Sequence, residues 1–315
     1  MVGEPPVEQP RGREPVRHRL DLGRRAEVAQ ERSDLLRRLQ AAEGAEQAEK
    51  LLHDAGIGFT PNGRTLHVHC LDLDLELLFA RADDIPRWTA DGAVELGITG
   101  RNVIIESGVE LDELLALGFG GCRLAVAVPG DSEIRDVQGL AGRRVATSYR
   151  RTVELALAER GVEAELVELT GSVELAPRLG IADAVIDLVS SGETLRQNGL
   201  REVANLLDSE AVLVARPGLA GEQAALVEDL RLVLESVLAA RPKRYLMLNT
   251  RDDRLDEVLA LLPGLDAPTV LPLARTGMHA VHAVIEADDV VRLLGPLRGA
   301  GATSLLVLPI EHLIP

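Results

Sequence analysis

Residues 186–195 of the chain, IDLVSSGETL, place three hydroxyl groups and a glycine directly after an apolar run. A strand, a polar glycine turn and a helix in that order direct backbone N–H groups toward an anion. Gly192 would let the backbone approach such an anion closely. The hydroxyls of Ser190, Ser191 and Thr194 add further donors. The pattern therefore predicts a loop that binds an anion.

Asp187 stands at the end of the predicted strand, where its carboxylate would repel a phosphate but could accept hydrogen bonds from sugar hydroxyls. Several donors beside one carboxylate favour a phosphorylated sugar over a bare phosphate. A simpler interpretation also exists, because Ser190 and Glu193 have the spacing of a capping box that merely begins a helix. The residues alone leave both interpretations open.

The elements that must position this loop alternate between strands and helices. The whole chain has 315 residues, a length typical of two or three domains. The alternation predicts a mostly parallel α/β sheet in two lobes. After residue 244 the order changes to β-α-β-β-α-β, which is the ferredoxin-like arrangement.

Composition and charge limit the possible partners. The net charge of −16 argues against a general nucleic-acid surface, which needs clustered basic residues. No apolar run reaches the roughly 18–20 residues that span a bilayer, so no membrane association is expected. We see no apolar segment typical of a secretory signal. Cys70 and Cys122 lack metal-ligand or redox spacing, which suits a reducing compartment and predicts a cytoplasmic protein.

A longer stretch around the loop resembles a known family. Residues 171–200, GSVELAPRLGIADAVIDLVSSGETLRQNGL, resemble the signature of ATP phosphoribosyltransferases. The positions that match the spacing of that signature are Glu174, Gly180, Ala182, Val185, Asp187, Ser191, Gly192, Thr194 and Leu195. The likeness continues upstream through LALGFGGCRLAVAVP and downstream through LPGLDAPTVLPL, and covers roughly residues 46–315.

The resemblance implies an activity, a cofactor and an architecture. Members of the family transfer the phosphoribosyl group of phosphoribosyl pyrophosphate (PRPP) to N1 of ATP, release pyrophosphate and require Mg²⁺. This reaction is the first step of histidine biosynthesis. The resemblance implies two catalytic lobes like those of type II periplasmic binding proteins. In the long form, a C-terminal domain binds histidine as an allosteric inhibitor. The family also implies a homo-oligomer, with dimers that associate into hexamers.

We therefore expect four parts in the chain. These are a flexible tail (1–33), catalytic lobe I (34–123 and 217–244), catalytic lobe II with the PRPP loop (124–216) and a ferredoxin-like regulatory domain (245–315). Two alternatives remain open. One is a catalytically weakened paralogue that binds a phosphosugar or nucleotide without turnover, and the other is a solute-binding module.

The resemblance also assigns residues. For PRPP it implies the loop residues Asp187, Ser190, Ser191, Gly192 and Thr194. Arg81 stands where the family has an arginine that faces the cleft, and Arg101 is a second candidate for catalysis at the polyphosphate. The alternative for each arginine is a surface ion pair with a neighbouring Asp.

Two further residues, Tyr149 and Glu174, are candidates for the nucleotide site. The alternative for Tyr149 is simple packing at a strand end. His67 and His69 share one strand face and could bind a metal, but the sequence offers no evident third ligand. We therefore interpret them as ordinary strand residues, and Asp72, Asp74 and Glu76 as a solvated edge.

The beginning of the chain departs from the family. Members start with a strand that ends in an Asn-Lys-Gly turn, whereas this chain has SDLLRRLQAAEGA before its first clear helix. The apolar spacing from Leu35 to Leu52 predicts a helix instead. A sheet without that strand, and a cleft without that lysine, predict a less stable and less active protein. Only a substitute strand formed by residues 35–45 would restore the missing strand of the sheet.

Overall fold

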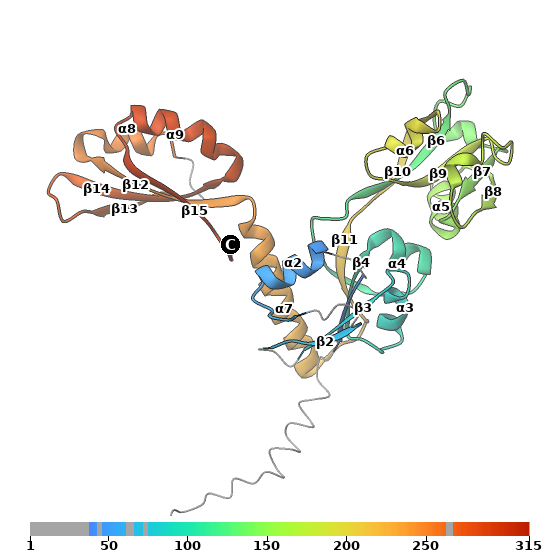
Figure 1. Cartoon of the computed structure of the whole chain (residues 1–315), viewed down its shortest axis with the longest axis horizontal. Helices are drawn as coiled ribbons and strands as arrows, with labels where there is room; N and C mark the ends of the chain where they lie inside the picture. Colours follow the sequence, from blue (N-terminus) through green and yellow to red (C-terminus); the bar gives the residue numbers. More distant parts are fainter. Residues whose placement is uncertain (1–37, 43–45, 61–65, 72–74, 263–266, 315) are drawn as a thin grey trace, which may run out of the picture. The chain divides into compact units, whose positions relative to one another are not determined.

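The computed structural model describes residues 38–42, 46–60, 66–71, 75–262 and 267–314, and the predicted flexible tail lies outside them. Within the described residues the chain forms three sheets, each with a hydrophobic core of its own (Figure 1). None of the described helices combines the length and the apolar character needed to cross a bilayer.

The first sheet has the strand order β2-β3-β1-β4-β11-β5. Its strands are β1 (Arg38–Ala42), β2 (His67–His69), β3 (Glu76–Ala80), β4 (Leu96–Gly100), β5 (Asp112–Ala116) and β11 (Ala211–Ala215). The helices of this lobe are α2 (Glu46–Asp54), α3 (Ile85–Ala90), α4 (Arg101–Ser107) and α7 (Gly221–Ala240). Leu51 of α2, Leu77 of β3 and Leu234 of α7 are buried in one core, which therefore joins segments far apart in the sequence.

The first strand, which the sequence pattern did not indicate, is present. Our prediction of one helix from Leu35 to Leu52 is wrong for residues 38–42, which form β1, and the helix α2 begins only at Glu46. β1 lies between β3 and β4 and runs parallel to both, with Leu39 opposite Leu77 and Leu96. Pairing on both sides satisfies its backbone groups, and this tertiary context overrides a sequence that lacks β-branched residues.

The second sheet has the order β10-β6-β9-β7-β8. Its strands are β6 (Cys122–Pro129), β7 (Arg144–Thr147), β8 (Glu165–Glu168), β9 (Ala184–Val189) and β10 (Leu200–Ser209). The helical segments are α5 (Arg150–Ala158), α6 (Glu193–Gln197) and the 3₁₀ turns η1 (Gln138–Leu140) and η2 (Val173–Leu175). Neighbouring residues of β9, Val185 and Ile186, are buried in two different cores, so both faces of this sheet are covered.

The expectation of mostly parallel sheets is wrong. β6 pairs antiparallel with β9 and β10, and β11 pairs antiparallel with β4 and β5. The reason is that the chain passes into the second lobe and returns, and the returning strand runs against its neighbours. Because β11 belongs to the first sheet, the return falls near residue 210, before the expected boundary at 216.

The third sheet forms the predicted β-α-β-β-α-β unit. It contains β12 (Lys243–Arg251), β13 (Thr269–Pro272), β14 (Met278–Glu286) and β15 (Thr303–Pro309), in the antiparallel order β13-β14-β12-β15. The helices are α8 (Leu255–Leu259) and α9 (Val290–Gly299), with the 3₁₀ turns η3 (Asp252–Arg254) and η4 (Ala287–Asp289). Figure 1 shows both helices on one face of the sheet. The ferredoxin-like arrangement is thus confirmed.

Candidate functional site

The predicted anion loop connects β9 to α6. The side chains of Ser190, Ser191 and Thr194 are exposed there. Gly192 has φ of 74°, the left-handed region that side chains other than glycine rarely adopt. A Cβ added to it would meet the Arg196 side chain only at 3.4 Å. Backbone conformation, rather than crowding, therefore explains glycine at this position.

The capping-box interpretation of Ser190 and Glu193 is wrong. The residue before α6 is Gly192, which has no side chain to cap the helix. The Glu193 carboxylate instead accepts hydrogen bonds from Arg196 and Gln197 within α6. Ser191 Oγ accepts a long bond, 3.4 Å, from the Glu193 N–H. The hydroxyl of Ser190 makes no such bond within the described part of the chain, and can face a ligand.

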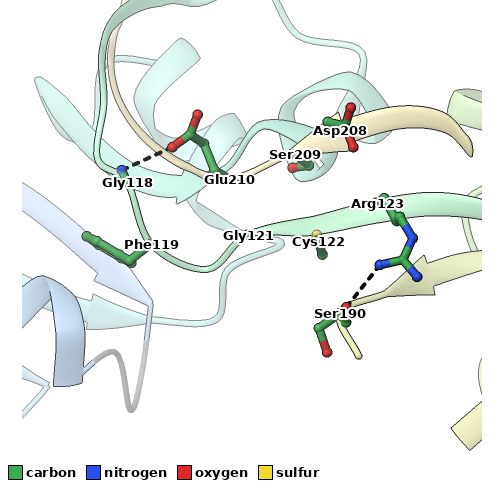
Figure 2. Close-up of a pocket in the computed structure, with 9 residues that line it drawn as sticks. All are labelled: Gly118, Phe119, Gly121, Cys122, Arg123, Ser190, Asp208, Ser209 and Glu210. Atoms are coloured by element: carbon green, nitrogen blue, oxygen red, sulfur yellow. Dashed lines mark hydrogen bonds between the residues drawn. The ribbon is translucent and has the colours of Figure 1, made fainter. Parts of the chain in front are cut away.

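Arg123 of β6 fixes the start of the loop. Its Nη1 donates to the carbonyl oxygen of Ser190 at 3.0 Å, as Figure 2 shows. Its Nε and Nη2 donate to both oxygens of Glu202 at 2.7 and 2.6 Å. Both contacts join residues that are distant in the sequence, so no local pattern indicates a role for Arg123. The bidentate pair orients the guanidinium and, through it, the loop.

A pocket of about 450 Å³ lies beside this anchor (Figure 2). It is formed by the two segments that cross between the first and second sheets. Its lining residues are Gly118, Phe119, Gly121, Cys122, Arg123, Ser190, Asp208, Ser209 and Glu210. The crossings are tied together, since the Gly118 N–H donates to Glu210 Oε2 at 3.0 Å and the Ala211 N–H donates to the carbonyl of Phe119. The start of the anion loop therefore borders a polar pocket at the crossing.

Asp187 lies half-buried near the end of β9. Burial raises the pKa of its carboxyl above the usual range, and the neighbouring charge of Glu174 raises it further. The Leu188 N–H opposes this, because it donates to Asp187 Oδ1 at 2.8 Å. Two carboxylates that repel each other in a partly buried place favour binding of a cation or of hydroxyl donors.

Tyr149 stands directly before α5 and belongs to the same electrostatic environment. Burial raises its pKa to about 12, and the charges of Asp187 and Asp83 contribute. The phenol therefore stays protonated at neutral pH and can donate a hydrogen bond. Of the residues predicted for the site, Glu174 thus acts on the pKa of Asp187, and Asp187 acts on the pKa of Tyr149.

The two candidate arginines differ in their surroundings. Arg81 follows β3, is exposed, and makes no ion pair within the described residues. Arg101 donates to both oxygens of Glu113 at 3.0 and 2.6 Å, and lies 3.7 Å from Glu210. The paired-arginine alternative therefore describes Arg101, although its partners are glutamates rather than a neighbouring Asp.

Glu106 of α4 is a further residue that the sequence did not indicate. Its carboxylate accepts hydrogen bonds from the backbone N–H of Arg151 at 3.1 Å and of Thr152 at 2.8 Å, and from the Thr152 hydroxyl at 2.7 Å. Because Tyr149 supplies no side-chain cap to α5, Glu106 takes over that role from the first lobe.

Comparisons with known proteins agree with this architecture. A family model described as ATP phosphoribosyltransferase matches residues 81–236, and one described as HisG, C-terminal domain, matches residues 240–312. The ATP phosphoribosyltransferase of Cytophaga hutchinsonii is 42% identical over 270 residues, which are 86% of this chain and 94% of that protein. The one of Maricaulis maris is 44% identical over 278 residues, covering 86% and 95%.

One solved structure has a similar fold over part of this chain. It is the ATP phosphoribosyl transferase (HisG:HisZ) complex from Thermotoga maritima, which covers 65% of this chain and 99% of that chain. The TM-score is 0.56 at 22% sequence identity.

Proposed function

Because the chain belongs to the ATP phosphoribosyltransferase family, whose members catalyse the first step of histidine biosynthesis, we propose that the site around Asp187 and Gly192 carries out this transfer. In the reaction, N1 of the adenine of ATP forms a bond to the anomeric carbon of PRPP. The bond from that carbon to pyrophosphate breaks, and its electron pair leaves with the pyrophosphate. Positioning and charge stabilisation supply the catalysis, so no covalent nucleophile is needed.

The loop holds the phosphoribosyl end of PRPP in this proposal. The 5-phosphate accepts hydrogen bonds from loop N–H groups and from the hydroxyls of Ser190, Ser191 and Thr194. Asp187 accepts hydrogen bonds from the ribose hydroxyls. The single observation that carries this assignment is the exposed loop with Gly192 at φ of 74° beside the half-buried Asp187.

The leaving pyrophosphate needs cations. Arg81 is the first candidate, since its guanidinium has no ion pair within the described residues. Arg101 is the second, and would have to exchange part of its pairing with Glu113 for the substrate. Mg²⁺, when bound, neutralises charge on the phosphate oxygens that leave. Asp187 and Glu174 fit it, because they offer hard oxygen ligands whose mutual repulsion a cation relieves.

The adenine of ATP binds near Tyr149 and Glu174. Tyr149 offers an aromatic ring and a protonated phenol, and Glu174 lies near enough to Asp187 to influence its titration. These features support a nucleotide beside the ribose of PRPP, as the transfer requires.

Calorimetry with PRPP and Mg²⁺ tests the loop assignment. The variant S190A/S191A should bind PRPP at least tenfold more weakly than the parent chain, since two hydroxyl donors to a charged group are lost. S132A is the matched control, because Ser132 lies in another loop of the same lobe, where its Oγ accepts a bond from the Ile134 N–H. Equal PRPP affinity in the parent chain, S190A/S191A and S132A would contradict the assignment of this loop to the PRPP site.

We further propose that the third sheet unit, residues 245–315, binds histidine and inhibits the transfer. A physical link to the first lobe supports this proposal. The Ser236 hydroxyl of α7 hydrogen-bonds with His312 Nδ1 at 2.8 Å, and the Leu313 N–H donates to the carbonyl of Ser236 at 2.9 Å. Ser236 is buried in the helix that packs on the core of the first lobe. A change in the third unit can therefore reach α7 through this contact.

A homo-oligomer, from dimers to hexamers, is also part of the proposal. The face of the third sheet opposite α8 and α9 carries exposed apolar side chains. Leu306 and Leu308 are 54% and 45% exposed there, and they lie opposite Met247 and Tyr245 in the register of β12 and β15. An exposed apolar sheet face of this kind favours contact with a second copy. We place the protein in the cytoplasm, in line with two cysteines that form no disulfide.

A further inference from the structure

The edge of the first sheet holds a cluster of side chains that the transfer reaction does not use. β2 is the edge strand and pairs antiparallel with β3, so that His69 lies opposite Glu76. His67 and His69 stand two residues apart and project from the same face of β2. The third ligand that the sequence did not reveal is therefore Glu76, which the hairpin brings beside both histidines. Its side chain is only 19% exposed, so the expectation of a solvated edge is wrong for this residue.

The distances in this cluster match those between ligands of one metal ion. Glu76 Oε1 lies 3.0 Å from His67 Nε2 and 3.3 Å from His69 Nε2. One ligand atom from each of the three residues lies within 4.8 Å of the others. Ligands at zinc distances on a tetrahedron are about 3.3 Å apart. Only a small movement of the imidazoles, whose centroids are 5.0 Å apart, is needed to enclose an ion.

From this geometry we propose that His67, His69 and Glu76 form a binding site for a divalent transition metal of the first row, with Zn²⁺ as its first candidate. Two imidazoles and a carboxylate suit Zn²⁺, Co²⁺ or Ni²⁺, whereas Mg²⁺ prefers oxygen ligands. The two histidine side chains are 52% and 72% exposed, which lets the ion enter from solvent and leaves a coordination position for water.

The nearby thiol does not complete the site. Cys70 follows His69 but is buried in the core of the first lobe. Alternation along the strand also directs Cys70 to the face opposite His69.

The metal would act as a clamp on the hairpin. β2 has only three residues, and its backbone pairs with β3 alone. Coordination by two side chains of β2 and one of β3 would fix the register of this edge strand and protect it from fraying. This metal differs in ligand chemistry from the Mg²⁺ of the transfer reaction, so the two can be loaded and removed separately.

Calorimetry with ZnCl₂ tests the site on the full chain, prepared without a histidine tag and freed of metals by a chelator. The expected result is one Zn²⁺ per chain. H69N and E76Q should each weaken Zn²⁺ binding at least tenfold. Removing a residue that only orients a metal ligand typically lowers metal affinity by that factor or more, and removing a ligand itself should have at least the same effect. E110Q is the matched control, since Glu110 is exposed and lies outside the cluster. Equal Zn²⁺ affinity in parent, H69N and E76Q would overturn the proposal.

Cobalt spectroscopy gives a second measurement that needs no variant. Co²⁺ bound by the parent chain should show the intense visible absorption of a four-coordinate ion, and ZnCl₂ should displace it in a ratio of one to one. If the parent chain gave no more than the weak spectrum of hexaaqua Co²⁺, the proposed site would be contradicted. This measurement does not depend on whether H69N or E76Q folds.

Discussion

The carboxylate of Glu106 caps the first turn of α5 by accepting hydrogen bonds from both the backbone N–H and the hydroxyl of Thr152, at 2.8 and 2.7 Å. The two residues belong to different lobes, so this contact fastens α4 to α5. It also keeps the segment that carries Tyr149 in place, because Tyr149 immediately precedes α5.

Replacing Glu106 should loosen this junction. E106A leaves the N–H groups of Arg151 and Thr152 without their acceptor, and should lower the stability by about 1–3 kcal/mol. T152V removes one of the three bonds and should cost less. Thermal unfolding of E106A, T152V and the double variant measures the coupling between the two residues. Strictly additive effects would show that the two side chains do not act together.

Gly192 should be essential for the PRPP loop because of its backbone conformation. G192A forces a residue with a side chain into the left-handed region, at a cost of about 1–2 kcal/mol, and should weaken PRPP binding at least tenfold while ATP binding stays unchanged. G142A is the matched control, since Gly142 has φ of 68° in a turn of the same lobe away from the loop. PRPP affinity that falls equally in both variants would indicate general destabilisation.

Arg81 and Arg101 should contribute unequally to turnover. R81A should lower kcat by roughly 10²-fold, the usual effect of losing one preorganised group that stabilises a leaving group. R101A should lower kcat less, because the guanidinium of Arg101 already forms ion pairs with Glu113 and Glu210. R87A serves as a control for the loss of an exposed positive charge on α3. Steady-state kinetics with PRPP as the varied substrate will rank the three, and a larger loss in R101A would reverse our assignment.

Asp187 should lower the stability of the folded protein at neutral pH, although it is needed to bind PRPP. Since burial raises its folded-state pKa, the folded protein holds this proton more tightly than the unfolded chain, and the stability contributed by this group falls as pH rises through the folded pKa. D187N should therefore melt at a higher temperature than the parent at pH 7, and the difference should shrink near pH 4. The same variant should lose PRPP binding. A D187N protein less stable than the parent at pH 7 would contradict the assigned direction.

The contact between His312 and Ser236 should transmit inhibition by histidine. H312A should still bind histidine in calorimetry within about twofold of the parent, but more histidine should be needed to inhibit turnover. This separation is expected because the change removes the side-chain hydrogen bond to Ser236 of α7, while the backbone bond from the Leu313 N–H and the third sheet stay intact. Unchanged inhibition in a histidine-binding H312A chain would show that coupling follows another route.

Local patterns predicted some parts of this fold well. The β-α-β-β-α-β unit has clear apolar periodicity in each strand and helix. The loop after β9 combines a glycine with several hydroxyl residues, a combination that is typical of an anion-binding turn. β1 was missed because the sequence RLQAA favours a helix locally, and only pairing with β3 and β4 makes it a strand. Arg123 and Glu106 were missed, and Glu76 was interpreted as a solvated edge, for a related reason. Each acts on a partner brought near by the fold, as Arg123 does on Ser190 and Glu202.

The presence of β1 also changes the expectation for activity. The family's Asn-Lys-Gly turn is absent from the sequence, and residues 43–45, which follow β1, lie outside the described residues. The sheet nevertheless has its central strand, so one of the two reasons to expect a weakened paralogue does not hold. The absent lysine remains a reason to expect slower turnover.

The most direct test of the account is to mix the full chain with ATP, PRPP and MgCl₂ and to follow N1-phosphoribosyl-ATP by its absorbance and mass. We predict that this product and pyrophosphate form in equal amounts, and that D187N forms far less of both. A folded chain that binds PRPP and ATP but forms no product would contradict the assigned activity.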